Sequence, residues 1–130
     1  MTLDRTSIIT LYAVGVVFLI VALQGFLVPR LFMAPVEIEL TNASALAEVR
    51  AGYGGCFGAL ACVFFLGARC ESWRRSSLGV GGVVLSVFVM GRLLSLAVDG
   101  MPNLFSLGIL AAEATGATAC VWQWRKKRLL

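Results

Sequence analysis

Four long apolar segments constrain the fold of this 130-residue chain more than any other feature of its sequence. They extend over about residues 8–28, 44–68, 78–98 and 104–124. A helix of about 20 residues spans the hydrocarbon core of a bilayer, which is about 30 Å thick. Hydrophobic residues make up 59% of the chain and charged residues only 14%, which is far from the composition of a soluble domain. We therefore predict an all-α fold, a transmembrane four-helix bundle with up-down topology that forms a single membrane domain over residues 1–130.

Basic residues gather at one end of this predicted bundle, which we call the inner end. They are Arg5, Arg69, Arg74, Arg75 and the Arg-Lys-Lys-Arg run at residues 125–128. Loops rich in lysine and arginine stay in the cytoplasm, and tryptophans such as Trp73, Trp122 and Trp124 prefer the membrane interface. We therefore expect a multi-pass protein of the bacterial inner (cytoplasmic) membrane with both termini in the cytoplasm. A cleaved signal peptide is the alternative for residues 8–28, but the run is long for one and no Ala-x-Ala site follows it.

The residue types argue against metal and nucleic-acid chemistry. Histidine is absent, and Cys56, Cys62, Cys70 and Cys120 show no Cys-x-x-Cys spacing, so we predict no metal site and no cofactor. The basic residues lie at the ends of apolar runs instead of forming a stripe with interleaved aromatics. We therefore expect the lipid bilayer, and no nucleic acid, as a partner.

Small residues predict where the helices approach one another closely. Gly54 and Gly58 form a Gly-x-x-x-Gly pair in the second segment, and Gly108, Ala112 and Gly116 recur at four-residue spacing in the fourth. The longest polar connection precedes the second segment, and we expect it to lie at the interface at the outer end. A short basic connection is expected at residues 69–77.

Arg92 lies well inside the third apolar segment, where a charged side chain persists only if it faces a partner, water or a ligand. Ser95 and Asp99 follow at positions i+3 and i+7, which puts all three on one helix face. Glu113 lies nine residues into the fourth segment, about 14 Å below its outer start, at a depth comparable to that of Arg92. We predict an ion pair between Arg92 and Glu113.

Three further polar residues, Glu48, Arg50 and Tyr53, lie near the outer end of the second segment. Glu48 shares one helix stripe with Gly52, while Arg50 and Tyr53 share another, and either stripe could face the bundle. Glu48 and Arg50 could also do no more than cap the helix at headgroup level, where charge costs little. The complete candidate pocket in the outer half consists of Glu48, Arg50, Tyr53, Arg92, Ser95, Asp99 and Glu113.

Three interpretations of these charges stay open. They form an internal network that sets how the helices pack, they line a cavity that binds a ligand, or Asp99 and Glu113 act as an acid and base pair. Under the first two interpretations, the internal network and the ligand cavity, we predict no catalytic residue.

The same residues carry a resemblance to a known family. The motifs are Glu-Val-Arg-Ala-Gly-Tyr-Gly-Gly at residues 48–55, Gly-Arg-Leu-Leu-Ser at 91–95, Asp-Gly-Met-Pro at 99–102, and Glu113. Over most of its length the chain resembles a bacterial family of small four-helix membrane proteins described only as a domain of unknown function, similar in layout to the DoxX-like proteins. DoxX-like proteins include partners of membrane oxidoreductases, and similar small proteins serve as scaffolds or sterol-handling subunits. The resemblance therefore implies an accessory or ligand-binding role.

We accordingly expect an accessory or scaffold subunit that binds a lipid or quinone-like ligand and associates with a larger membrane protein or with further copies of itself. The first alternative is a transporter of a small molecule or lipid. The second is an isomerase-like enzyme that acts on an apolar substrate through paired carboxylates.

Overall fold

The computed structural model describes residues 2–126, and side chains from Arg5 onward. This part of the chain is mainly helical and contains no strand, which confirms the all-α prediction. Four of its helices are long and apolar enough to cross a membrane; they span Arg5–Leu27, Ala43–Arg69, Glu71–Val98 and Leu104–Lys126.

The first span is one continuous helix, whereas the second consists of three consecutive segments. Helix α1 (Thr2–Leu27) ends before Pro29, which opens the short α2 (Pro29–Met33) and is followed by a 3₁₀ turn, η1 (Ala34–Val36). The second span consists of α3 (Ala43–Val49), a π-helical segment η2 (Arg50–Cys56) and α4 (Phe57–Arg69). Asn42 caps α3, because its Oδ1 accepts a 2.8 Å hydrogen bond from the backbone N–H of Ala45.

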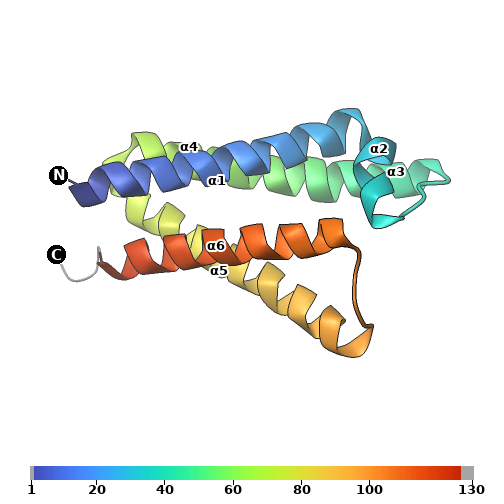
Figure 1. The fold of residues 1–130 in the computed structure, drawn as a ribbon. Coiled ribbons are helices and arrows are strands. Elements are labelled where there is room, and N and C mark those ends of the chain that lie inside the picture. The colour runs from blue at the N-terminus through green and yellow to red at the C-terminus, as the bar shows by residue number, and fades with distance from the viewer. Residues whose placement is uncertain (1, 127–130) are drawn as a thin grey trace.

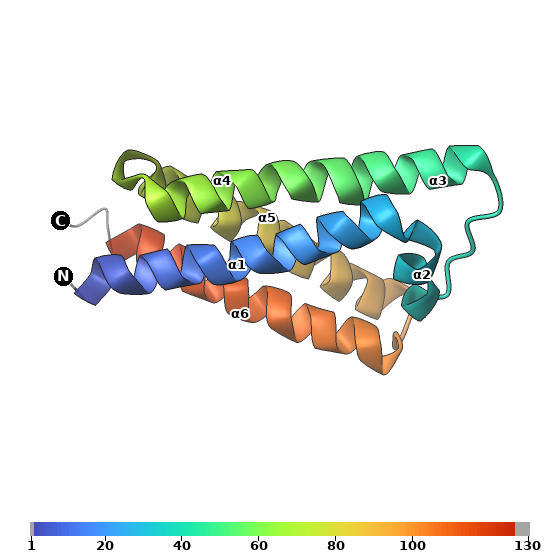
Figure 2. The same cartoon turned by 90° about the horizontal axis from the view of Figure 1, so that it is seen from above.

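The last two spans are the continuous helices α5 (Glu71–Val98) and α6 (Leu104–Lys126). Helix α1 packs along η2 and α4, α5 packs along α6, and α4 joins the two pairs through its contact with α5. Figures 1 and 2 show that α1 begins and α6 ends at the same end of the bundle, which is the inner end. The opposite, outer end carries α2, η1 and the turn between α5 and α6.

The third helix begins at Glu71, seven residues before the predicted start at residue 78. Residues 71–77 are therefore not the basic connection that their composition suggested; Cys70 alone is extended, with φ −105° and ψ 118°. Two buried polar side chains of this segment, Arg74 and Ser77, donate hydrogen bonds to carbonyls of α4. Arg74 Nη2 donates to the carbonyl of Ala68 at 3.4 Å, and Ser77 Oγ donates to the carbonyl of Val63 at 2.9 Å.

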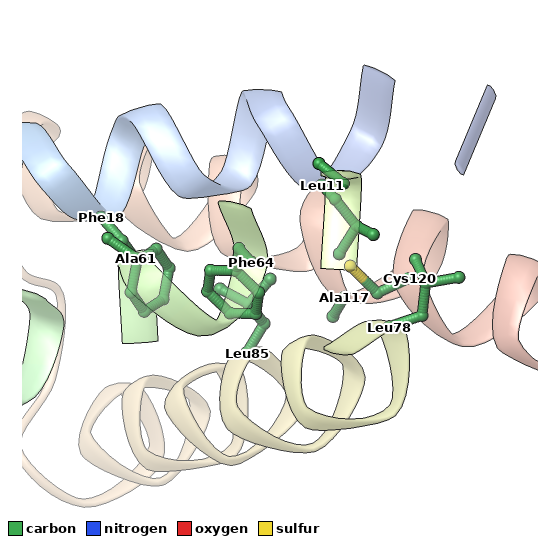
Figure 3. Close-up of a cluster of buried hydrophobic side chains, with 9 residues drawn as sticks. Leu11, Phe18, Ala61, Phe64, Leu78, Leu85, Ala117 and Cys120 are labelled. Carbon is green, nitrogen blue, oxygen red and sulfur yellow. The ribbon is translucent and has the colours of Figure 1, made fainter. Parts of the chain in front are cut away.

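The hydrophobic core fills the inner half of the bundle. Figure 3 shows its members converging from all four spans: Leu11, Phe18, Ala61, Phe64, Leu78, Leu85, Ala117 and Cys120. By contrast, no residue between Leu85 and Ala117 is buried. The outer halves of α5 and α6 accordingly spread apart toward the turn that connects them (Figure 1).

The two predicted close-packing edges have different outcomes. The edge on the second span is present, since a Cβ at Gly54 would lie 2.6 Å from the ring of Phe26, and one at Gly58 would lie 3.7 Å from Ala22. The edge on α6 is present only at Gly116, whose added Cβ would lie 3.0 Å from Leu85. Gly108 has no atom within 4 Å of such a Cβ, so the prediction was wrong there because α5 has already diverged from α6 at that level.

Candidate functional site

An ion pair between Arg92 and Glu113 joins α5 to α6 in the outer half, as the sequence predicted. Arg92 Nε donates to Glu113 Oε2 at 2.6 Å, and Arg92 Nη2 donates to Glu113 Oε1 at 3.1 Å. A bidentate contact of this kind binds more strongly and with better defined geometry than a single charged hydrogen bond. The Arg92 side chain is nevertheless 34% exposed and the Glu113 side chain 13% exposed.

Antiparallel packing brings the two charges to one level. Arg92 lies six residues before the end of α5, about 9 Å by helix rise, and Glu113 lies nine residues after the start of α6, about 14 Å. An isolated charge at such a depth in a bilayer is costly, and an ion pair reduces that cost. Each residue therefore supplies the partner that the other requires.

Ser95 and Asp99 form a separate contact one to two turns farther out on α5. Ser95 Oγ donates to Asp99 Oδ2 at 2.8 Å, and both residues are exposed. Asp99 also closes α5 as its C-terminal cap. Asp99 and Glu113 thus have different partners, which is not the arrangement of two carboxylates that share one substrate atom.

A cavity of about 210 Å³ lies beside the ion pair, between the outer halves of α5 and α6. Arg92, Ser95 and Ser106 are its polar wall residues, and apolar residues that include Leu96, Leu107 and Leu110 form much of the remainder. At about 30 Å³ per water molecule, it holds about seven waters, or one small ring or headgroup. The site therefore combines charge, hydroxyl groups and apolar wall between the outer parts of α5 and α6, where no residue is buried.

Arg50 and Tyr53 are turned toward α1 and α2. Arg50 Nε donates to the carbonyl of Phe26 at 3.3 Å, in the last turn of α1. The ring of Tyr53 lies 5.2 Å from that of Phe32 and 5.6 Å from that of Phe57, centroid to centroid. Arg50 and Tyr53 are both exposed, but of the two stripes theirs is the one that contacts neighbouring helices.

The other stripe of the second span is open. Glu48 is exposed, and a Cβ at Gly52 would have no atom within 4 Å. The seven candidate residues therefore do not form one cluster. Arg92, Ser95, Asp99 and Glu113 lie together on α5 and α6, and the link from Tyr53 to α5 runs through Phe57, whose ring stacks on Phe88 at 5.7 Å.

The π-helical segment η2 was not predicted. It covers Arg50–Cys56, and π-helical turns are rare and occur frequently at functional sites. The glycines at positions 52, 54 and 55 are a sequence signal for weak helix, but they do not distinguish a π turn from close packing. Here the backbone of Gly54 packs closely against Gly25 of α1. A Cβ added at Gly25 would lie only 2.8 Å from the backbone nitrogen of Gly54.

A second hollow, of about 520 Å³, lies at the outer end among residues 30–41 and was not predicted from the sequence. Arg30 Nε donates to the carbonyl of Leu40 at 3.4 Å across this connection. Asn103 Nδ2 donates to the carbonyl of Pro35 at 2.8 Å, which ties η1 to the turn between α5 and α6. Among residues 2–126, no three cysteine or carboxylate side chains lie close enough to hold a metal ion.

Comparison with known proteins gives one match. The model of a family described as a domain of unknown function (DUF4345) matches residues 7–124. No curated protein and no solved structure matches the chain significantly.

Proposed function

We propose a function for this chain, which belongs to the DUF4345 family, from the Arg92–Glu113 ion pair inside its membrane-spanning helices α5 and α6. In this proposal it is a multi-pass protein of the bacterial inner membrane and a non-enzymatic accessory subunit, DoxX-like in layout. It binds a lipid or quinone-like molecule between the outer halves of α5 and α6.

The observation that carries the proposal is the incomplete enclosure of Arg92. Glu113 engages its Nε and Nη2, whereas a guanidinium has five N–H donors, so donors remain for a second acceptor. The side chain is one-third exposed and lines the cavity together with Ser106. An ion pair with a purely structural role has no need of an adjoining cavity.

These donors favour a ligand with an oxygen-bearing head and an apolar body. A carbonyl or phosphoryl oxygen accepts from the free edge of Arg92, and the head fits a volume of about 210 Å³. Leu96, Leu107 and Leu110 supply apolar contacts for the adjoining part of the molecule. The body of a lipid or the tail of a quinone would continue into the surrounding bilayer.

The two alternatives receive less support. The packed inner half, with Phe18, Phe64 and Leu85 buried, argues against a transport path through a single chain. The separate partners of Asp99 and Glu113 argue against an isomerase with paired carboxylates.

Photocrosslinking in native membranes tests the binding site. A photoreactive benzophenone amino acid replaces Leu107 in the cavity wall or, as a control, Val87, which is 57% exposed on α5 and does not line the cavity. Mass spectrometry of the adducts should give one dominant small-molecule mass at position 107 and a mixture of bulk phospholipids at position 87. Arg92→Leu should remove the dominant adduct; the same mixture at both positions would contradict ligand binding.

Recovery of a partner tests the accessory role. Tagged protein is extracted in a mild detergent after chemical crosslinking of native membranes. The proposal predicts recovery of a larger membrane protein in a fixed ratio, or of a defined oligomer of this chain. Recovery of a strict monomer without a partner would contradict the accessory role. It would not contradict the ligand site, which photocrosslinking tests separately.

A further inference from the structure

The charged side chains outside Arg92 and Glu113 are distributed unequally between the two ends of the bundle. Among the residues whose side chains are described, 5–126, the inner end carries six cations and one carboxylate: Arg5, Arg69, Arg74, Arg75, Arg125, Lys126 and Glu71. The sequence adds one more carboxylate, Asp4, just before them. The outer end carries two cations and four carboxylates: Arg30, Arg50, Glu37, Glu39, Glu48 and Asp99. The inner end is therefore strongly positive, whereas the outer end is negative.

Two of the inner cations are held in place by tryptophan rings. The Arg75 guanidinium carbon lies 5.7 Å from the ring centroid of Trp124, so this contact joins the start of α5 to the end of α6. Lys126 Nζ lies 3.8 Å from the ring centroid of Trp122. A cation fixed over a ring loses less conformational freedom when it binds an anion, which favours binding.

The ring of Trp124 is itself fixed by close packing against α5. A Cβ added at Gly79 would lie 3.1 Å from Trp124 Nε1, which is a tight contact, so the ring packs closely against the α5 backbone. The position of Arg75 is therefore set by the packing of α5 on α6.

Three of these cations, Arg75, Arg125 and Lys126, have no acidic partner within the described part of the chain. Over residues 5–126, none of Arg75, Arg125 and Lys126 pairs with a carboxylate; the ion pair described there is that of Arg92 with Glu113. Ser72 and Ser76 are exposed on the same first two turns of α5 and add hydroxyl donors. Cys70 provides no side-chain cap to α5, so the positive end of this helix dipole adds to the field.

We infer that the first turns of α5 and the last turn of α6 form a binding site for the headgroup of an anionic glycerophospholipid. The rings of Trp73 and Trp122 are about half exposed, at 51% and 52%, and suit the boundary between headgroups and acyl chains. That depth selects a membrane lipid over a soluble anion, because the cations lie beside groups that belong in the interface. The site is separate from the proposed ligand cavity, which lies in the outer half.

The tryptophans allow a direct test, because all three in the chain, Trp73, Trp122 and Trp124, lie at the inner end. The purified full chain is reconstituted in phosphatidylcholine vesicles that contain a fixed fraction of brominated phosphatidylglycerol or, separately, brominated phosphatidylcholine. Bromine quenches only nearby rings, so the ratio of the two quenching levels gives the relative affinity of this end for the anionic lipid.

The expected result is a preference for phosphatidylglycerol that falls about fivefold for each cation removed in Arg75→Gln and Lys126→Gln. Arg30→Gln removes the same charge at the outer end and should leave the preference unchanged. Arg5→Gln, at the inner end but on α1, should reduce it less than Arg75→Gln does. Equal quenching by the two lipids in the unaltered protein would overturn the inference, and so would equal losses for Arg5→Gln and Arg75→Gln, which would indicate a diffuse field without a site.

Discussion

Arg92 Nε lies 2.6 Å from Glu113 Oε2, and this contact joins α5 to α6 at a level where neither helix has a buried residue. Most of the packing that holds the two helices together lies farther in, around Leu85, Ala117 and Cys120. The ion pair therefore limits how far the outer halves can separate, and with them the width of the adjoining cavity.

Replacement of one member of the Arg92–Glu113 pair should lower the free energy of unfolding more than replacement of both. Glu113→Gln leaves the Arg92 cation without its carboxylate, and we expect a loss of about 1–2 kcal/mol in the free energy of unfolding, below the range for fully buried pairs because Arg92 is one-third exposed. Arg92→Met together with Glu113→Leu should recover most of that loss. Denaturation in mixed detergent micelles compares the unaltered protein, Arg92→Met, Glu113→Leu and the double variant, which form a closed cycle; strictly additive losses would show that the pair has no energetic coupling.

The contact between Gly67 of α4 and Ser77 of α5 makes a second prediction. A Cβ at position 67 would overlap the Ser77 side chain, whose hydroxyl is already held by the carbonyl of Val63. Gly67→Ala should therefore lower stability by about 1–3 kcal/mol through overpacking. Gly91→Ala is the matched control, because it lies in α5 with nothing within 4 Å of the added Cβ and should gain up to about 1 kcal/mol from helix propensity. Equal stability of the two variants would mean that α4 and α5 do not approach as closely as described.

Local sequence signals were sufficient for the spans and for the charged pair. The length of the apolar segments and the helix rise of 1.5 Å per residue place Arg92 and Glu113 at one depth, and no knowledge of side-chain packing is needed for that step. The early start of α5 could not be predicted in this way. Arg74 and Ser77 look like loop residues until the carbonyls of Ala68 and Val63 on another helix are placed beside them.

The divided site has a similar cause. Arg50, Tyr53 and Arg92 all belong to the outer half by depth, but depth does not determine which neighbour a side chain faces. Arg50 finds the carbonyl of Phe26, which lies in the last turn of α1 just before Pro29 ends the regular helix. The contact of Arg50 with Phe26 depends on the path of α1 and α2. The spacing of residues in the second span carries no information about that path.

The π-helical segment predicts an asymmetry between two single-residue deletions. A π turn accommodates one residue more than an α-helix, so deletion of Gly52 should restore regular α-helix in η2 and change stability by less than about 1 kcal/mol. Deletion of Gly91 in the regular helix α5 rotates Arg92 by about 100° relative to the inner part of α5, and it should break the pair with Glu113.

Thermal unfolding in detergent compares the two deletions directly, and both glycines have open space around them. We expect a clearly lower midpoint for the Gly91 deletion than for the Gly52 deletion. Equal midpoints, or greater damage from the Gly52 deletion, would show that η2 contributes an essential geometry of its own.

The charge difference between the two ends predicts the orientation in the membrane. Six described cations lie at the inner end, and Lys127 and Arg128, outside the described residues, follow in the sequence. Since basic connections are retained in the cytoplasm, this end should face the cytoplasm. Thr41 at the outer end and Ser72 at the inner end are both exposed and suit single-cysteine labelling.

The labelling requires a background without native thiols, in which the buried Cys120 becomes alanine and the exposed Cys56, Cys62 and Cys70 become serine. A maleimide that cannot cross the inner membrane should modify Thr41→Cys in cells whose outer barrier has been opened, and Ser72→Cys only after lysis. The helix count alone requires the two positions to lie on opposite sides, so labelling of both before lysis would contradict the four-span fold. Labelling of Ser72→Cys, but not of Thr41→Cys, before lysis would agree with the four-span fold but show the opposite orientation. The Arg92 cavity would then lie in the cytoplasmic half of the bilayer.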